Sequence, residues 1–67
     1  MKEYQDVRLL TNKYFHDYGI KKGDIGVILE NYDGNYYEVE FCDEKGATKA
    51  LFAFPKEELE AVEIVGS

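Results

Sequence analysis

The sequence predicts an all-β fold, and three observations carry this prediction. Apolar and polar side chains alternate with a period of two in several short segments, most clearly over residues 36–42, which is the pattern of a half-buried strand. Three glycines lie within residues 19–26, and glycine at that density disfavours a helix. The pair Asp33-Gly34 lies between two segments rich in β-branched and aromatic residues, as in a tight β-hairpin.

The first expected strand covers Tyr4–Leu10, where Val7 and Leu9 share one face and polar residues occupy the other. Residues 11–22 show no clean period, contain Gly19 and end at a Lys-Lys-Gly turn. We therefore expect a long loop there, with at most one helical turn.

The second expected strand covers Asp24–Glu30, and the Asp–Gly turn lies within residues 31–35. Strict alternation would divide the side chains of this strand into two faces, Ile25, Val27 and Leu29 on one and Ile28 on the other. The third expected strand, Tyr36–Cys42, alternates most clearly, with three side chains inward and two outward: Tyr37, Val39 and Phe41, against Glu38 and Glu40.

The remaining segments complete a set of five strands. We expect a second turn, a fourth strand, a short helical turn that proline begins, and a last strand: Asp43–Gly46, Ala47–Phe54, Pro55–Leu59 and Glu60–Val65. In the last strand, Val62 and Ile64 are expected to face inward and Glu63 outward. A long first loop, two tight hairpins and a helical turn before the final strand are typical of a five-stranded SH3-like small barrel. We expect one such domain over residues 1–67.

Composition limits the class of protein. The formal net charge is −6, and it is unevenly spread, with +2 over residues 1–22 and −8 over residues 23–67. Such a surface repels nucleic acid and attracts a basic protein. The single cysteine, Cys42, excludes an intrachain disulfide and a zinc cluster. Neither a signal peptide nor a membrane span is recognisable, so a cytoplasmic protein without membrane contact is expected.

Enzyme chemistry has little support in the sequence. Cys42 and His16 could form a nucleophile and base pair, but no third group is evident to orient them. Ser67 lies at the terminus, where a nucleophile is poorly held. The carboxylates Glu38 and Glu40 are two residues apart on one strand face, which is too few ligands for a metal site. The glycines of residues 19–26 lack the ending of a phosphate-binding loop. We expect a non-enzyme without metal or cofactor.

Two features point to binding instead. Carboxylates crowd the second hairpin and the C-terminal third, and tyrosines flank the long loop and the first hairpin. Carboxylates also serve solubility, and loop aromatics can plug the end of a barrel, which we expect of Phe15. As a set, however, acids steer cationic partners, and tyrosine is a common interface anchor. The expected partner-binding residues are Tyr14, Tyr18, Tyr32, Tyr36, Glu38, Glu40, Asp43, Glu44, Glu57, Glu58 and Glu63.

Three blocks of sequence resemble a known family. They are the YQDVRL segment at residues 4–9, the GIKKGDIGV segment at residues 19–27 and the YEVEF segment at residues 37–41. The chain resembles a family of short bacterial proteins of unassigned function, and the likeness extends from Tyr4 to Val62. The resemblance implies an SH3-like barrel and a likeness to immunity or antitoxin proteins that are encoded beside toxins, including nucleases. It implies no catalytic residue.

The leading hypothesis is an immunity- or antitoxin-type protein that occludes the active site of a basic toxin, such as a nuclease. One alternative is a small-barrel nucleic-acid binder, in which basic side chains meet the phosphate backbone: Arg8, Lys13, Lys21 and Lys22. Another is a module for peptide binding or assembly, with the tyrosine-rich loop as its site. We expect a monomer or a weak homodimer.

Overall fold

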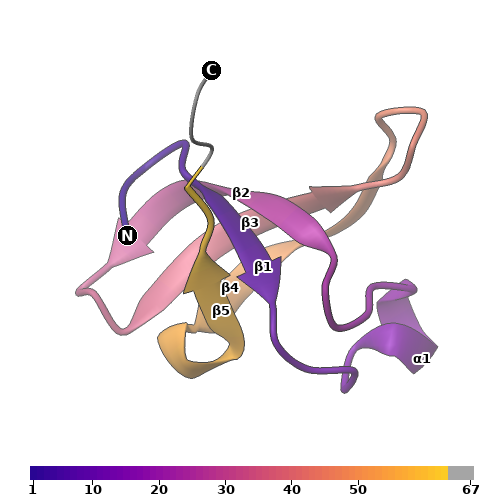
Figure 1. The fold of residues 1–67 in the computed structure, drawn as a ribbon, viewed down its shortest axis with the longest axis horizontal. Coiled ribbons are helices and arrows are strands. Elements are labelled where there is room, and N and C mark those ends of the chain that lie inside the picture. Colours follow the sequence, from indigo (N-terminus) through magenta and orange to yellow (C-terminus); the bar gives the residue numbers. More distant parts are fainter. Residues whose placement is uncertain (64–67) are drawn as a thin grey trace.

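The chain forms one antiparallel sheet of five strands that bends into a small barrel (Figure 1). The computed structural model describes residues 1–63. The elements are β1 (Asp6–Leu9), α1 (Phe15–Tyr18), β2 (Ile25–Tyr32), β3 (Tyr36–Cys42), β4 (Thr48–Pro55), the 3-10 helix η1 (Lys56–Glu58) and β5 (Leu59–Ala61). The strand order is β4-β3-β2-β1-β5, with every neighbouring pair antiparallel. The predicted all-β, five-stranded small-barrel fold, with its long first loop and its helical turn before the last strand, is confirmed.

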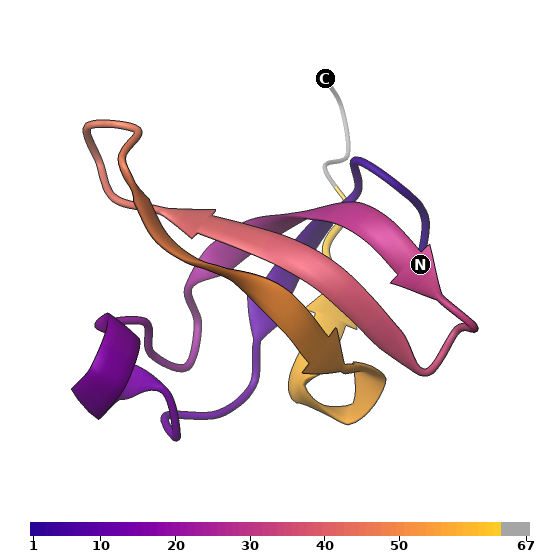
Figure 2. The same cartoon turned by 180° about the vertical axis from the view of Figure 1, so that it is seen from behind.

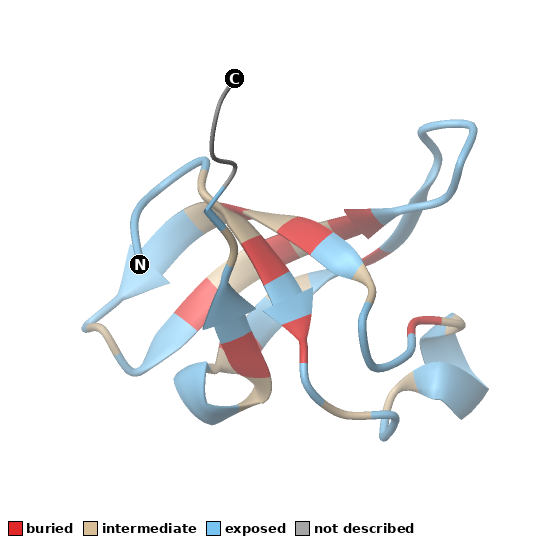
Figure 3. Cartoon of the chain, viewed as in Figure 1, coloured by how far each residue is buried: buried red, intermediate tan, exposed pale blue. Residues whose placement is uncertain are grey.

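Residues of all five strands contribute to the core, and Figure 3 shows the buried positions in red along the strands. In β3 the inward side chains are Tyr37, Val39 and Phe41, as the sequence predicts, and the outward glutamates are half-buried. The remaining buried hydrophobic residues are Val7, Leu9, Ile20, Ile28, Ala50, Phe54 and Leu59. No helix among residues 1–63 is long and apolar enough to cross a membrane.

The first hairpin turns where the Asp–Gly pair predicts. Asp33 and Gly34 have φ angles of 59° and 72°, both in the left-handed region, and together with Asn35 they form the three-residue loop between Tyr32 and Tyr36. The Asn31 side-chain oxygen accepts a hydrogen bond from the Gly34 N–H at 2.7 Å. The turn therefore fixes the register of β2 against β3, with Tyr32 opposite Tyr36.

A β-bulge in β2 corrects the predicted division of its faces. Ile28 pairs with Val39, but the next pair is Glu30 with Glu38, so Leu29 is the extra residue of the bulge. Before the bulge even-numbered side chains face the core, and after it the even-numbered ones face outward. Ile28 is fully buried, whereas Ile25 at the start of the strand is exposed.

The last strand is shorter than the predicted Glu60–Val65. Strand β5 begins at Leu59, which is buried and extended, because η1 ends one residue earlier than expected. Val62 is half-buried and Glu63 exposed, and both follow the strand, although the Val62 N–H still donates to the Asp6 carbonyl at 2.9 Å. Ile64 lies outside the described residues.

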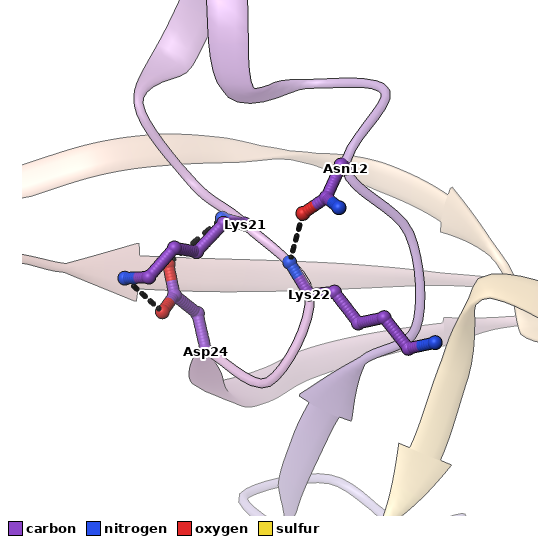
Figure 4. Close-up of polar contacts among 4 residues, drawn as sticks. All are labelled: Asn12, Lys21, Lys22 and Asp24. Atoms are coloured by element: carbon purple, nitrogen blue, oxygen red, sulfur yellow. Dashed lines mark hydrogen bonds and ion pairs between the residues drawn. The ribbon is translucent and has the colours of Figure 1, made fainter.

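The long loop between β1 and β2 folds back on itself through polar contacts (Figure 4). The Asn12 side-chain oxygen accepts a hydrogen bond from the Lys22 N–H at 2.8 Å, and Asp24 accepts one from the Lys21 N–H at 2.9 Å. Burial raises the pKa of the Asp24 carboxyl, but the hydrogen bonds and charge of Lys21 outweigh it, and the net shift is downward. Ile20, fully buried, anchors the loop to the core.

Within this loop, Tyr14 and not Phe15 closes one end of the barrel. The Tyr14 ring makes edge contacts with Phe52 and Phe54 at centroid distances of 5.3 and 5.1 Å. Phe15 is 56% exposed, which contradicts the prediction that it plugs the barrel. The reason is that α1 is a single turn, so only one face of the segment reaches the sheet.

We predict that Gly26→Ala destabilises the protein by about 1–3 kcal/mol. A Cβ at this position would lie 2.8 Å from the Glu40 carbonyl oxygen and 2.8 Å from Val39 Cγ1, so β2 and β3 would have to separate. Urea unfolding measures the loss. Gly46→Ala is the control, since its Cβ would meet open space and only its φ of 84° opposes the change. A Gly26→Ala variant as stable as the wild type would contradict this close approach.

We also predict that Tyr14→Phe lowers the free energy of unfolding by about 1 kcal/mol. The variant keeps the ring packing and loses the hydrogen bond that the Tyr14 hydroxyl donates to Glu58. Phe15→Ala, at an exposed ring, should change the free energy of unfolding by less than about 0.5 kcal/mol. The reverse ranking in thermal or urea unfolding would show that Phe15 closes the barrel.

Candidate functional site

The convex side of the β2–β3 hairpin gathers acidic and tyrosine side chains on one surface. We define this outer face by Glu30, Tyr32, Tyr36, Glu38 and Glu40. The register places Tyr32 opposite Tyr36 and Glu30 opposite Glu38. Because side chains directly opposite each other in an antiparallel pair are neighbours, the five form a continuous surface. It carries three carboxylates and no basic residue.

A tyrosine hydroxyl holds two of these carboxylates together. The Tyr32 oxygen lies 3.0 Å from Glu38 Oε1 and 3.2 Å from Glu30 Oε2. The hydrogen bond to Glu38, partial burial and the charges of both glutamates raise the pKa of Tyr32 to about 12. Tyr32 is therefore a neutral donor at neutral pH. Two carboxylates share its single proton, which leaves most of their acceptor capacity free for a cation.

Exposed apolar surface borders the carboxylates. Tyr32 is 40% exposed, Tyr36 50% and Leu51 of β4 47%. Leu51 lies opposite Glu40, and Ala53, also exposed, lies opposite Glu38. The surface thus alternates ring, carboxylate and aliphatic group, which is suited to the stem and head of a lysine or arginine side chain.

Glu40 ends the outer face on the side away from the first hairpin. Its carboxylate accepts a hydrogen bond from the Thr48 hydroxyl on β4. Partial burial and the nearby Glu40 raise the pKa of the Cys42 thiol, so the thiol is protonated at neutral pH. This chemistry does not favour Cys42 as a nucleophile.

Other predicted binding residues are engaged within the chain. The Tyr14 hydroxyl donates to Glu58, and the Lys13 amine lies 2.7 Å from the other Glu58 oxygen. Burial, and after it the bond to Glu58, raises the pKa of Tyr14. These contacts tie the long loop to η1. Tyr18 is partly exposed and packs on Phe52 at a centroid distance of 5.0 Å.

The remaining predicted acids lie elsewhere. Asp43 and Glu44 are in the β3–β4 turn, at the opposite end of β3 from Tyr36 (Figure 1). The Asp43 carboxylate accepts hydrogen bonds from two backbone N–H groups of that turn, which is a structural task. Glu57 is exposed on η1, and Glu63 is exposed after β5. The structure therefore brings together four of the eleven predicted residues: Tyr32, Tyr36, Glu38 and Glu40.

Sequence reasoning missed Glu30 and Leu51 as members of this surface. Strict alternation put Glu30 on the same side as Ile28, and only the bulge at Leu29 moves it next to Glu38. Leu51 belongs to an apolar strand, and nothing in its neighbours signals that it faces outward. Its pairing with Glu40 settles the direction.

The other candidate chemistry finds no geometric support in the described part of the chain. His16 is on the exposed turn α1, and its Nδ1 lies 3.2 Å from the neighbouring Asp17. No hydrogen bond joins it to Cys42 within residues 1–63. The same range holds no group of three or more His, Cys, Asp or Glu side chains arranged to hold a metal ion.

The basic side chains proposed for nucleic acid are mostly paired. Arg8 contacts Glu60 across β1 and β5, Lys13 contacts Glu58 and Lys21 contacts Asp24 at 3.2 Å. The basic side chains of these pairs are exposed, whereas Glu58 and Asp24 are half-buried, and each pair lowers the positive potential of the surface. The long loop does not form a concentrated cationic surface.

We predict that the Tyr32 hydroxyl ionises at a higher pH than a tyrosine hydroxyl that has no carboxylate neighbours. In an alkaline titration, Tyr32→Phe should remove tyrosinate absorbance that develops near pH 12, and Glu38→Gln should move it to lower pH. Because the folded pKa is raised, unfolding releases the Tyr32 proton above pH ~10, and stability falls as pH rises from there toward 12. Tyr32→Phe should make that fall less steep. An unchanged titration curve would contradict the hydrogen bonds at Tyr32.

Comparison with known proteins identified a family to which no activity is assigned. Neither the curated proteins nor the solved structures include a match to this chain. Residues 3–61 match a family model described as "Domain of unknown function (DUF4926)". This span includes every strand and the whole outer face. The chain therefore belongs to the DUF4926 family of unknown function.

Proposed function

We propose that this protein is an immunity- or antitoxin-type binding protein that neutralises a basic protein toxin, such as a nuclease, by occluding its active site. The observation that carries the proposal is the outer face, where Glu30, Glu38 and Glu40 lie beside exposed tyrosine rings. The family resemblance to proteins encoded beside toxins supports it as well.

The mechanism is competition for a cationic groove. A nuclease binds the phosphates of its substrate with lysine and arginine side chains, and three carboxylates on a rigid sheet offer the same side chains an anionic surface. The net charge of −6 attracts such a partner at a distance, and charge attraction raises the association rate. Tyr32 and Tyr36 supply the contact area that charge alone lacks.

The sheet is suited to this task because its acids need no rearrangement. The first hairpin turn sets the register, and Tyr32 already holds Glu30 and Glu38 together. Binding therefore costs little side-chain ordering, which is the general advantage of a preorganised interface.

Nucleic-acid binding and peptide binding remain the alternative predictions. The ion pairs of Arg8, Lys13 and Lys21 disfavour the first. Tight binding to single-stranded or duplex RNA at low salt would replace the toxin proposal. A complex with a short peptide but with no intact basic protein would favour the module for assembly.

The test is inhibition of the toxin by the purified protein. The product of the neighbouring gene is assayed for nuclease activity and for complex formation. The double variant Glu30→Gln, Glu38→Gln should bind at least about tenfold more weakly, since each lost surface charge contributes up to ~1 kcal/mol. The salt dependence of binding should also become weaker.

The matched control is the double variant Glu44→Gln, Glu57→Gln. It removes the same charge from exposed sites outside the outer face, and its affinity should stay within about threefold of the wild type. Equal losses of affinity in both double variants would mean that only the net charge of the protein, and not the outer face, governs binding. Absence of both complex and inhibition with the neighbouring product would remove the proposal.

A further inference from the structure

Strand β4 forms one edge of the sheet, and its backbone is paired on one side only. Seven of its eight residues, Thr48–Pro55, pair with β3, Lys49 being the extra residue of a bulge, and no other segment of residues 1–63 donates to or accepts from their backbone. Figure 2 shows β4 at one edge of the sheet, with β3 along one side of it. In an antiparallel strand, alternate N–H and C=O groups point away from the neighbour, so this edge offers a template for another strand.

Features that discourage pairing with a further strand are present at both ends of β4 but not at its centre. Lys49 and the bulge between Phe41 and Cys42 mark the beginning of the strand, and Pro55 marks its end. Charged residues, bulges and proline all discourage pairing. The stretch between them, Ala50–Phe54, has none of these. An incoming strand of about five residues fits there.

The side chains along this stretch would contact an incoming strand differently on the two faces of the sheet. On the convex side, Leu51 and Ala53 are exposed, and one strand further in lie Glu40 and Glu38. Neighbouring strands are about 4.8 Å apart, so a lysine or arginine beside Ala53 can pass over its methyl group to the Glu38 carboxylate. On the concave side, half-buried Phe52 offers an apolar contact together with the exposed part of the Tyr18 ring.

We propose that the edge of β4 at Ala50–Phe54 binds an extended segment of the cationic partner as a sixth, antiparallel strand. The segment alternates basic residues, which face the carboxylates of the outer face, with apolar residues, which pack against Phe52 and Tyr18. This inference rests on the proposed function for the charge of the partner. It adds that main-chain hydrogen bonds to β4 hold the partner in register.

The experiment uses a nine-residue peptide of alternating lysine and valine, capped at both ends and labelled with a fluorophore. Its affinity for the full chain is measured by anisotropy. Two derivatives are N-methylated, one on the lysine amides and the other on the valine amides. Both have the same charge, but in a paired strand only one of the two sets points toward β4. We expect one derivative to lose at least tenfold in affinity and the other less than about threefold.

A pair of protein variants locates the edge that binds. Ala53→Lys places on β4 a charge of the same sign as the peptide and should lower the affinity for the unmethylated peptide at least tenfold. Ala61→Lys makes the same change at an exposed position of β5, the other edge strand, and should leave the affinity within about threefold. Circular dichroism confirms that both variants fold.

The outcomes separate this inference from the proposed function. Equal affinity of the two methylated derivatives would mean that the peptide binds by charge alone; the edge proposal is then overturned, and the binding of a basic partner by the outer face stands. No binding of the peptide also overturns the edge proposal, while toxin inhibition is judged by its own assay. A homodimer in light scattering that Ala53→Lys dissociates would assign the edge to a second copy, again against the proposal.

Discussion

The close pairing of β2 with β3 is the constraint on which the rest of the structure depends. At Gly26 the two backbones approach so closely that a Cβ would collide with the Glu40 carbonyl, and three residues further on the bulge at Leu29 changes which side chains face outward. The first hairpin turn fixes the register beyond the bulge. These features together put Glu30 beside Glu38 and Tyr32 beside Tyr36, and the bulge allows these two β2 side chains to face outward while Ile28 still faces the core.

The outer face also holds like charges close to one another. Like charges opposite each other in a sheet are destabilising, and Glu30 lies directly opposite Glu38. The Tyr32 hydroxyl relieves part of that repulsion by donating a hydrogen bond between the two carboxylates. The same hydrogen bonds and charges raise the pKa of Tyr32. A cationic partner would relieve more. Carboxylates held in mutual repulsion on a stable sheet favour the binding of positive charge.

The same residue types have different surroundings at the closed end of the barrel and on the convex side of the sheet. At one end Tyr14, Lys13 and Glu58 tie the long loop to η1, so residues that looked like binding groups in the sequence contribute to stability instead. On the convex side, the same residue types remain accessible. Residue type alone therefore does not decide the role of a tyrosine or glutamate in this chain, and whether its side chain packs or stays exposed depends on the element that it occupies. Family membership covers residues 3–61 and brings no assigned chemistry.

Local sequence determined the strands, the turns and the inward side of β3, because period-two alternation and the Asp33-Gly34 turn are local signals. It likewise determined the acidic balance and the long loop. Tertiary structure decided the rest. The bulge at Leu29 depends on pairing with β3, and strict alternation cannot reveal an inserted residue. The choice of Tyr14 over Phe15 as the closing ring, and the exposure of Leu51, depend on which surface lies opposite each side chain, and that surface comes from residues distant in the sequence.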